Sequence, residues 1–129
     1  MKQPVSMDVK PYKYPDLRVK ERDVVKSILS RYEYDTKLFC YRNNTGAGKF
    51  VYPGGKQSQF IRFGLPGAPD IMGVLKPSGR MVCIECKTAK GKQSPDQMAY
   101  QQLMEEYGAL YILARDVQDV ENAIREALA

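Results

Sequence analysis

The strongest constraint on the fold of this 129-residue chain is a pair of apolar segments separated by a short turn. Residues 71–75 read Ile-Met-Gly-Val-Leu, and residues 81–87 read Met-Val-Cys-Ile-Glu-Cys-Lys. The linker at residues 76–80 is rich in turn-forming residues, with a proline, a serine and a glycine. Strand-like runs joined by a turn of this length are typical of a β-hairpin. We therefore expect two neighbouring antiparallel strands in the middle of the chain.

Three segments carry the signals of α-helices. Apolar residues recur at helical spacing over residues 17–34, and Asp16 precedes them as a candidate N-cap. Residues 94–97 (Ser-Pro-Asp-Gln) supply an N-cap, a proline at the first helical position and a capping-box glutamine, so they predict a second helix that ends near Tyr107. A final helix starts at Asp116, and its apolar stripe is best explained by core packing.

Further strands are predicted on both sides of the hairpin. Residues 38–42 form a short aromatic run that ends in a turn sequence, and residues 109–114 form an apolar run typical of a buried strand. Residues 50–52 and 60–63 flank the turn-forming segment 53–55 (Pro-Gly-Gly). This region is consistent with a loose hairpin or with a basic loop.

The predicted order of elements is α, β, β, β, α, β, α, with the strands in the middle. This order favours a single α/β domain over residues 17–129. Residues 1–16 contain three prolines and show no sustained periodicity, so we expect an extended N-terminal arm.

The chain contains no histidine and only three cysteines, Cys40, Cys83 and Cys86. Catalytic triads and Cys-His pairs are therefore excluded, and so is a closed zinc site made of cysteine and histidine. Any catalysis must use carboxylates, lysine, hydroxyls or a hard metal bound by oxygen. On a strand, Cys83 and Cys86 point to opposite faces, so we interpret them as core residues.

The charge of the chain is unevenly distributed. Residues 1–63 carry 13 basic and 6 acidic side chains, whereas residues 64–129 carry 7 and 9. A basic half is the pattern expected of a nucleic-acid binder.

The odd number of cysteines and the absence of long apolar segments predict a soluble, cytoplasmic protein with no membrane partner. The glycines at residues 64–67 lack the Lys-Ser of a phosphate-binding loop, so no nucleotide cofactor is expected.

The predicted hairpin brings three charged residues together. Glu85 and Lys87 are two residues apart on one strand and therefore share a face. If Leu75 pairs with Arg80, Asp70 lies opposite Glu85; a one-residue slip places it opposite Cys86, still within cross-strand distance of Glu85. Two carboxylates this close favour a hard cation between them, Mg²⁺ or Mn²⁺. The alternative is a solvated Glu-Lys pair on an edge strand.

Asp70, followed after 14 residues by Glu85-Cys86-Lys87, matches the PD-(D/E)XK nuclease signature. The wider pattern resembles the VRR-NUC branch of that superfamily, as found in stand-alone phage and bacterial proteins. The matching residues are 42–46, Glu21, 64–73, 85–88, Gly91 and 94–97. The resemblance covers residues 17–127, and it implies the restriction-endonuclease-like αβββαβ core with a central mixed sheet flanked by helices.

The resemblance also implies a role for each matching residue. Asp70, Glu85 and the backbone carbonyl of Cys86 would bind the metal, with Glu21 binding directly or through water. Lys87 would assist the attacking water.

Two of these assignments have alternatives in the sequence. Gln97 would belong to the site, the capping box of Ser94, or both. Asp23 is the weaker substitute for Glu21.

Basic and amide side chains flank this constellation in the sequence. We interpret them as phosphate contacts that position DNA without reading its sequence. They are Arg42, Asn43, Asn44, Lys49, Lys56, Arg62, Lys90 and Lys92.

The sequence thus favours a metal-dependent DNA endonuclease that requires Mg²⁺ or Mn²⁺. By resemblance, we expect a homodimer that acts on branched DNA such as four-way junctions. The alternatives are a site-specific restriction-type endonuclease and a catalytically idle DNA-binding module.

Overall fold

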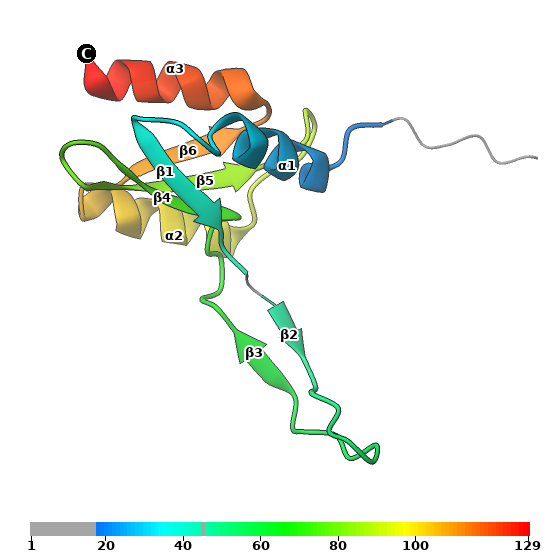
Figure 1. The fold of residues 1–129 in the computed structure, drawn as a ribbon. Coiled ribbons are helices and arrows are strands. Elements are labelled where there is room, and N and C mark those ends of the chain that lie inside the picture. The colour runs from blue at the N-terminus through cyan, green and yellow to red at the C-terminus, as the bar shows by residue number, and fades with distance from the viewer. Residues whose placement is uncertain (1–17, 45) are drawn as a thin grey trace, which may run out of the picture.

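The computed structural model describes residues 18–44 and 46–129, so the predicted N-terminal arm at residues 1–16 lies outside the described residues. Four strands form the central mixed sheet, in the order β1-β4-β5-β6 (Figure 1). These strands are β1 (Leu38–Arg42), β4 (Ile71–Leu75), β5 (Arg80–Cys86) and β6 (Leu110–Ala114). The pairs β1–β4 and β4–β5 are antiparallel, whereas β5 and β6 are parallel. The prediction of a mixed α/β domain is confirmed.

The register of the central hairpin is the first of the two that the sequence allowed. Leu75 pairs with Arg80, and Ile71 pairs with Ile84. Asp70 immediately precedes the first of these strands, and Glu85 follows Ile84 on the second, so the two carboxylates are brought to the same end of the sheet. The register is fixed because a slip by one residue would turn every buried side chain of β5 to the opposite face.

Helices cover both faces of the sheet (Figure 1). α1 (Glu21–Arg31) and α3 (Val117–Leu128) lie on one face, where aliphatic side chains of both helices and of all four strands form the main core. α2 (Pro95–Glu106) lies on the other face over a smaller cluster built around Cys83 and Tyr111. Cys86 belongs to the main core, so the two cysteines of β5 do point to opposite faces.

The first helix is shorter than predicted. It begins at Glu21 rather than at residue 17 and ends at Arg31 rather than at Tyr34. The start is set by Asp23, whose carboxylate accepts a hydrogen bond from the backbone N–H of Lys20 at 2.9 Å. The end is set by Asp35, whose carboxylate accepts from the N–H groups that lead into β1. Asp16, the predicted N-cap, lies outside the described residues.

The other two helices begin where the sequence predicts. Ser94 caps α2 by accepting a hydrogen bond from the Gln97 N–H at 3.2 Å. Asp116 caps α3 by accepting from the Asp119 N–H at 3.0 Å. None of the described helices is long and apolar enough to cross a membrane.

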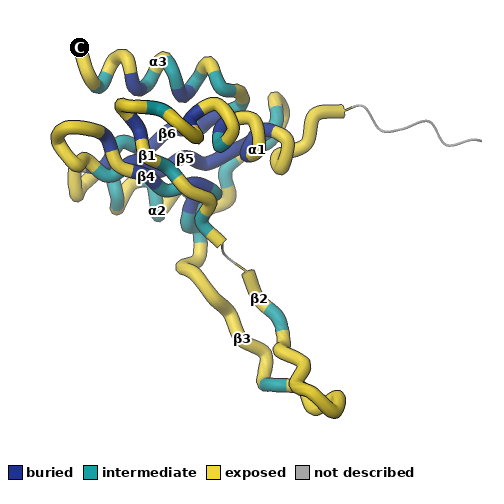
Figure 2. The backbone as a smooth tube through the Cα atoms, in the orientation of Figure 1, coloured by how far each residue is buried: buried dark blue, intermediate teal, exposed yellow. Residues whose placement is uncertain are grey.

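A long hairpin separates β1 from β4 and projects from the body of the molecule (Figures 1 and 2). Its two strands are β2 (Gly46–Gly48) and β3 (Ile61–Phe63). The loose hairpin expected around residues 53–55 is present: Val51 forms an isolated antiparallel bridge with Gln57, and the Tyr52 N–H donates to the carbonyl of Lys56 at 2.7 Å. We call residues 46–65 the β2–β3 hairpin.

Candidate active site

Asp70 lies where the β2–β3 hairpin returns to the sheet. Its Oδ2 accepts a hydrogen bond from the backbone N–H of Cys86 at 2.9 Å, which ties it to the end of β5. The Asn43 N–H donates to the Asp70 carbonyl at 2.8 Å, and the Asn43 side-chain amide donates to the carbonyl of Pro69 at 3.0 Å. Asn43, predicted to contact DNA, is thus used within the protein to hold the segment that carries Asp70.

Glu85 is the most buried charged residue among those described, with 2% of its surface exposed. Its Oε1 accepts a hydrogen bond from Gln97 Nε2 at 3.1 Å. The Gln97 side-chain oxygen also accepts from the Ser94 N–H at 2.8 Å, as a capping box requires. Gln97 therefore has both of the roles that the sequence allowed: it caps α2 and it orients Glu85.

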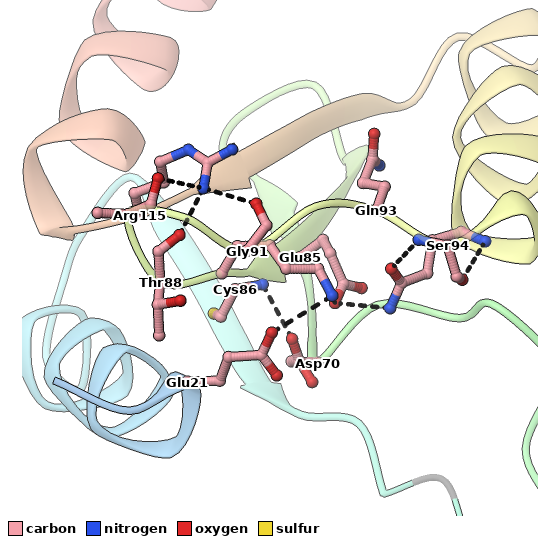
Figure 3. A network of polar contacts seen from close by, with 12 residues as sticks. Glu21, Asp70, Glu85, Cys86, Thr88, Gly91, Gln93, Ser94 and Arg115 are labelled. Carbon is pink, nitrogen blue, oxygen red and sulfur yellow. Dashed lines mark hydrogen bonds and ion pairs between the residues drawn. The ribbon is translucent and has the colours of Figure 1, made fainter. Parts of the chain in front are cut away.

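Lys87 connects the sheet to the first helix. Although it is only 8% exposed, its Nζ lies 3.3 Å from Glu21 Oε1 and 3.8 Å from Glu85 Oε1. Of the two candidate acids on α1, Glu21 faces the site, whereas Asp23 is occupied by the cap of its own helix. Figure 3 shows Glu21, Asp70 and Glu85 with their carboxylates directed toward one another.

The environment of Glu85 disfavours its charged form. Burial, the largest cause, together with the charge and hydrogen bonding of Asp70, raises the pKa of Glu85 to about 8, against the lowering effect of Lys87. A hydrogen bond between two carboxyl groups requires a proton on one of them. When Glu85 is ionised, its Oε2 is buried without a hydrogen-bond partner.

This orphaned oxygen fits a divalent cation. A buried anionic oxygen without a donor is costly, and a hard cation bound by oxygen removes that cost. Asp70 would supply a second carboxylate. Within residues 18–44 and 46–129, no three acidic or cysteine side chains are close enough to form a metal cluster by themselves, so water and backbone oxygen would complete the coordination.

Replacing Glu85 by glutamine is expected to stabilise the protein in EDTA at pH 8. The pKa of Glu85 in the folded protein, about 8, exceeds its ordinary value of 4.5, so the wild type loses stability as pH rises between these values. Glutamine keeps the shape without the buried charge, and we expect a gain of about 1–2 kcal/mol at pH 8 and little difference at pH 4. Urea unfolding of the wild type and the variant at pH 8 and at pH 4 measures these two differences in stability.

The same unfolding experiment includes a control with metal. Mg²⁺ or Mn²⁺ is expected to stabilise the wild type but not Glu85→Gln, because a bound ligand stabilises only the state that binds it. A variant that is less stable than the wild type in EDTA at pH 8 would contradict this account of Glu85.

Arg115 is a supporting residue that the sequence analysis missed. It follows β6, and its Nη1 donates to the backbone carbonyls of Thr88, Ala89 and Gly91 (Figure 3). These contacts fix the loop that immediately follows Lys87. The sequence signal is weak, because Arg115 is a single arginine after an apolar run, and its three partners lie more than 20 residues away.

The predicted phosphate contacts fall into two groups. Arg42, at the end of β1, Asn44, and the loop residues Lys90 and Lys92 are exposed around the end of the sheet that carries Asp70 and Glu85. Lys49, Lys56 and Arg62 are exposed on the β2–β3 hairpin. The structure therefore does not bring the eight predicted residues into one cluster.

Comparison of the chain with protein-family models and with curated proteins gives no match. Glu21, Asp70, Glu85, Lys87 and Gln97 are therefore the residues whose geometry points to a function.

Proposed function

We propose that the protein is a metal-dependent DNA endonuclease. The observation that carries this proposal is the buried Glu85, whose Oε2 lacks a partner beside Asp70 and whose Oε1 lies 3.8 Å from the ammonium of Lys87. A solvated Glu-Lys pair on an edge strand, the alternative for these residues, is wrong, because β5 lies between β4 and β6 and both side chains are buried.

Mg²⁺ or Mn²⁺ would be held by Asp70, Glu85 and the carbonyl of Cys86, with Glu21 binding directly or through water. When bound, such an ion supplies charge neutralisation for a phosphodiester and acidifies a coordinated water. The unpartnered Glu85 oxygen supports this ligand set.

Each remaining side chain has a task that its contacts support. Lys87 would hold the attacking water by a hydrogen bond from its ammonium, because its Nζ is directed to the carboxylates of Glu21 and Glu85. Glu21 orients that ammonium. Gln97 restricts the carboxylate of Glu85 to one orientation through its bond to Oε1.

The arrangement of elements supports the finer fold assignment, a restriction-endonuclease-like core. Leaving the β2–β3 hairpin aside, the order α1, β1, β4, β5, α2, β6 is αβββαβ, and the carboxylates come from the start of β4 and the end of β5. We further propose branched DNA as the substrate, with Arg42, Lys90 and Lys92 contacting phosphates around the site.

The proposal is tested by incubating the protein with linear duplex, single-stranded, flap and four-way-junction DNA in Mg²⁺, Mn²⁺ or EDTA. We expect cleavage in either metal, none in EDTA, and preference for the junction. Lys87→Ala is expected to lose cleavage because the water loses its positioning group, whereas Lys26→Ala, an exposed lysine on α1, is expected to cut like the wild type. If no DNA is cut in either metal, or if Lys87→Ala cuts at the wild-type rate, the proposal is wrong.

A further inference from the structure

The β2–β3 hairpin displays four aromatic rings to solvent, each between 46% and 60% exposed. They are Phe50, Tyr52, Phe60 and Phe63. The described residues build both hydrophobic cores without these rings. Exposed apolar side chains that gather in one place mark a binding surface more often than scattered ones do. The hairpin therefore has the character of a binding element rather than of a packing element.

The two faces of the β2–β3 ladder differ in what they carry. Phe63 pairs with Gly46, and Ile61 pairs with Gly48. Directly paired residues share a face, and the two glycines contribute no side chain to it. The opposite face carries Arg62, which pairs with Ala47. One face is thus apolar and bare of cross-strand neighbours, whereas the other holds a cation.

The surroundings of the two glycines show that the apolar face is flat and open. A Cβ added to Gly46 would lie 2.9 Å from Cε2 of Phe63, so the ring lies close against the backbone of Gly46. A Cβ added to Gly48 would meet no atom of the described residues within 4 Å. The space above Gly48, beside Ile61, is therefore open. We call Ile61, Phe63 and the backbone of Gly46 and Gly48 the glycine-backed face.

The hairpin carries positive charge without any negative charge. No aspartate or glutamate occurs between Asp35 and Asp70, while Lys49, Lys56 and Arg62 are exposed along the hairpin. A complementary partner must combine negative charge with a flat apolar surface. Nucleotides have both in one unit, since the phosphate is anionic and every base has a π-face that stacks on aromatic rings.

The glycine-backed face fits unpaired bases rather than a duplex. Within a duplex, the faces of the bases are stacked on one another, and only their edges are accessible in the grooves. Reading these edges requires hydrogen-bonding side chains, and Ile61 and Phe63 have none. Unpaired nucleotides expose the base faces that an apolar platform can hold.

The hairpin is connected directly to the candidate active site. The chain leaves the sheet at the end of β1 and returns to it at the start of β4, next to Asp70 (Figure 1). Figure 2 shows the hairpin exposed over most of its length as it extends from this end of the sheet. Nucleotides held on the hairpin would thus adjoin the DNA that reaches the carboxylates.

We propose that the glycine-backed face of the β2–β3 hairpin binds unpaired bases of DNA by stacking, while Lys49, Lys56 and Arg62 contact the phosphates between them. The hairpin selects DNA in which unpaired nucleotides adjoin a duplex, and so gives the site its preference for branched substrates. The choice of DNA as the ligand rests on the proposed function. Stacking itself requires neither metal nor cleavage, so the two proposals are tested separately.

The first test compares the binding of two DNA probes in EDTA, a single-stranded thymine oligonucleotide and a blunt duplex of the same length. Phe63→Ala is expected to raise the dissociation constant for the oligonucleotide by about 5–150-fold, the effect of losing one stacked base. Its affinity for the duplex is expected to stay unchanged. Phe39→Ala, which removes a 67% exposed ring from β1, is the matched control and is expected to bind both probes like the wild type.

The second test blocks the glycine-backed face without removing a contact. Gly48→Thr places a β-branched side chain in the open space, and threonine favours strands, so thermal stability is expected to be equal or higher. The dissociation constant for the oligonucleotide is nevertheless expected to rise about tenfold. Ala47→Thr adds a side chain of the same kind to the opposite face and is expected to bind like the wild type.

The salt dependence of oligonucleotide binding separates stacking from charge. Lys56→Ala/Arg62→Ala removes two phosphate contacts, so the slope of log affinity against log salt concentration is expected to become shallower by about 1.4. Phe63→Ala is expected to lower the affinity at every salt concentration and to keep the wild-type slope.

Three results would overturn the stacking proposal. The wild type binds the blunt duplex as tightly as the oligonucleotide, Phe63→Ala and Gly48→Thr both bind the oligonucleotide like the wild type, or Ala47→Thr weakens binding as much as Gly48→Thr does. A hairpin that serves an acidic protein surface instead would give the second of these results.

Cleavage of DNA in Mg²⁺ or Mn²⁺ reports on the proposed function alone. A protein that cuts no DNA but shows the expected differences between the variants overturns the endonuclease and supports the stacking face. A protein that cuts DNA but shows none of these differences overturns the stacking face and supports the endonuclease.

Discussion

Asp70→Asn is expected to lower the rate of metal-dependent DNA cleavage by at least about a thousandfold, equivalent to about 4 kcal/mol of transition-state stabilisation. Asparagine keeps the size of the side chain and an oxygen that can accept the Cys86 N–H, so the end of β5 stays in place. What is lost is the negative charge that, with Glu85, would attract a divalent cation. Single-turnover cleavage of the preferred DNA in Mg²⁺ or Mn²⁺ measures the effect.

A second aspartate offers a matched control. Asp35 also accepts backbone N–H hydrogen bonds through its Oδ2, but it lies in the turn between α1 and β1. Asp35→Asn is expected to cleave DNA at nearly the wild-type rate. DNA affinity measured in EDTA is expected to be unchanged or higher in Asp70→Asn, because one repulsive charge near the phosphates is removed. If Asp70→Asn cleaves DNA at the wild-type rate, a role for this carboxylate in metal binding is excluded.

Gly67→Ala is expected to damage both stability and activity. Gly67 has a φ of +78°, and an added Cβ would lie 2.2 Å from the backbone carbonyl oxygen of Asp96 and 2.9 Å from the Gln97 nitrogen. These are backbone atoms in the first turn of α2, so either that turn or the segment leading to Asp70 must move. A displacement of about 1 Å at such a position can reduce a rate by about a hundredfold, which is the reduction we expect in cleavage.

Gly79→Ala is a control that has the unfavourable backbone conformation of Gly67→Ala without its steric clash. Gly79 has a φ of +75°, but an added Cβ there would meet no atom within 4 Å. Both variants pay about 1–2 kcal/mol for a left-handed alanine, and Gly67→Ala is expected to lose about 1–3 kcal/mol more because of the overlap. Thermal unfolding measures stability, and cleavage by Gly79→Ala is expected to remain normal. Equal effects of the two substitutions would contradict the close packing of Gly67 on α2.

Local patterns were sufficient to predict the central hairpin and the start of α2. The sequence allowed two registers for this hairpin, both of which bring Asp70 close to Glu85, and the structure has the one in which Leu75 pairs with Arg80. Ser94 and Gln97 form their capping box within one helical turn. Each of these features is determined by residues close together in the sequence.

The features that the sequence did not predict depend on distant contacts or on residues without strong preferences. Strand β2 is Gly-Ala-Gly, which has no strand propensity, and its pairing with β3 forms it. The contact of Gly67 with the first turn of α2, and the contacts of Arg115 with the loop after Lys87, join segments far apart in the chain. The predicted start of α1 at residue 17 was wrong because the Asp23 cap competes with continuation of the helix toward that residue.

The place where the β2–β3 hairpin joins the sheet has a consequence for how such a protein can diversify. β1 and β4 are paired over five residue pairs irrespective of what connects them, and the hairpin contains none of Glu21, Asp70, Glu85, Lys87 or Gln97. Insertions, deletions and changes of composition in the hairpin therefore leave the pairing of the sheet and the position of these five side chains intact. The exposed hairpin and the cluster of these five side chains thus occupy separate parts of one small domain, and each can vary while the other is preserved.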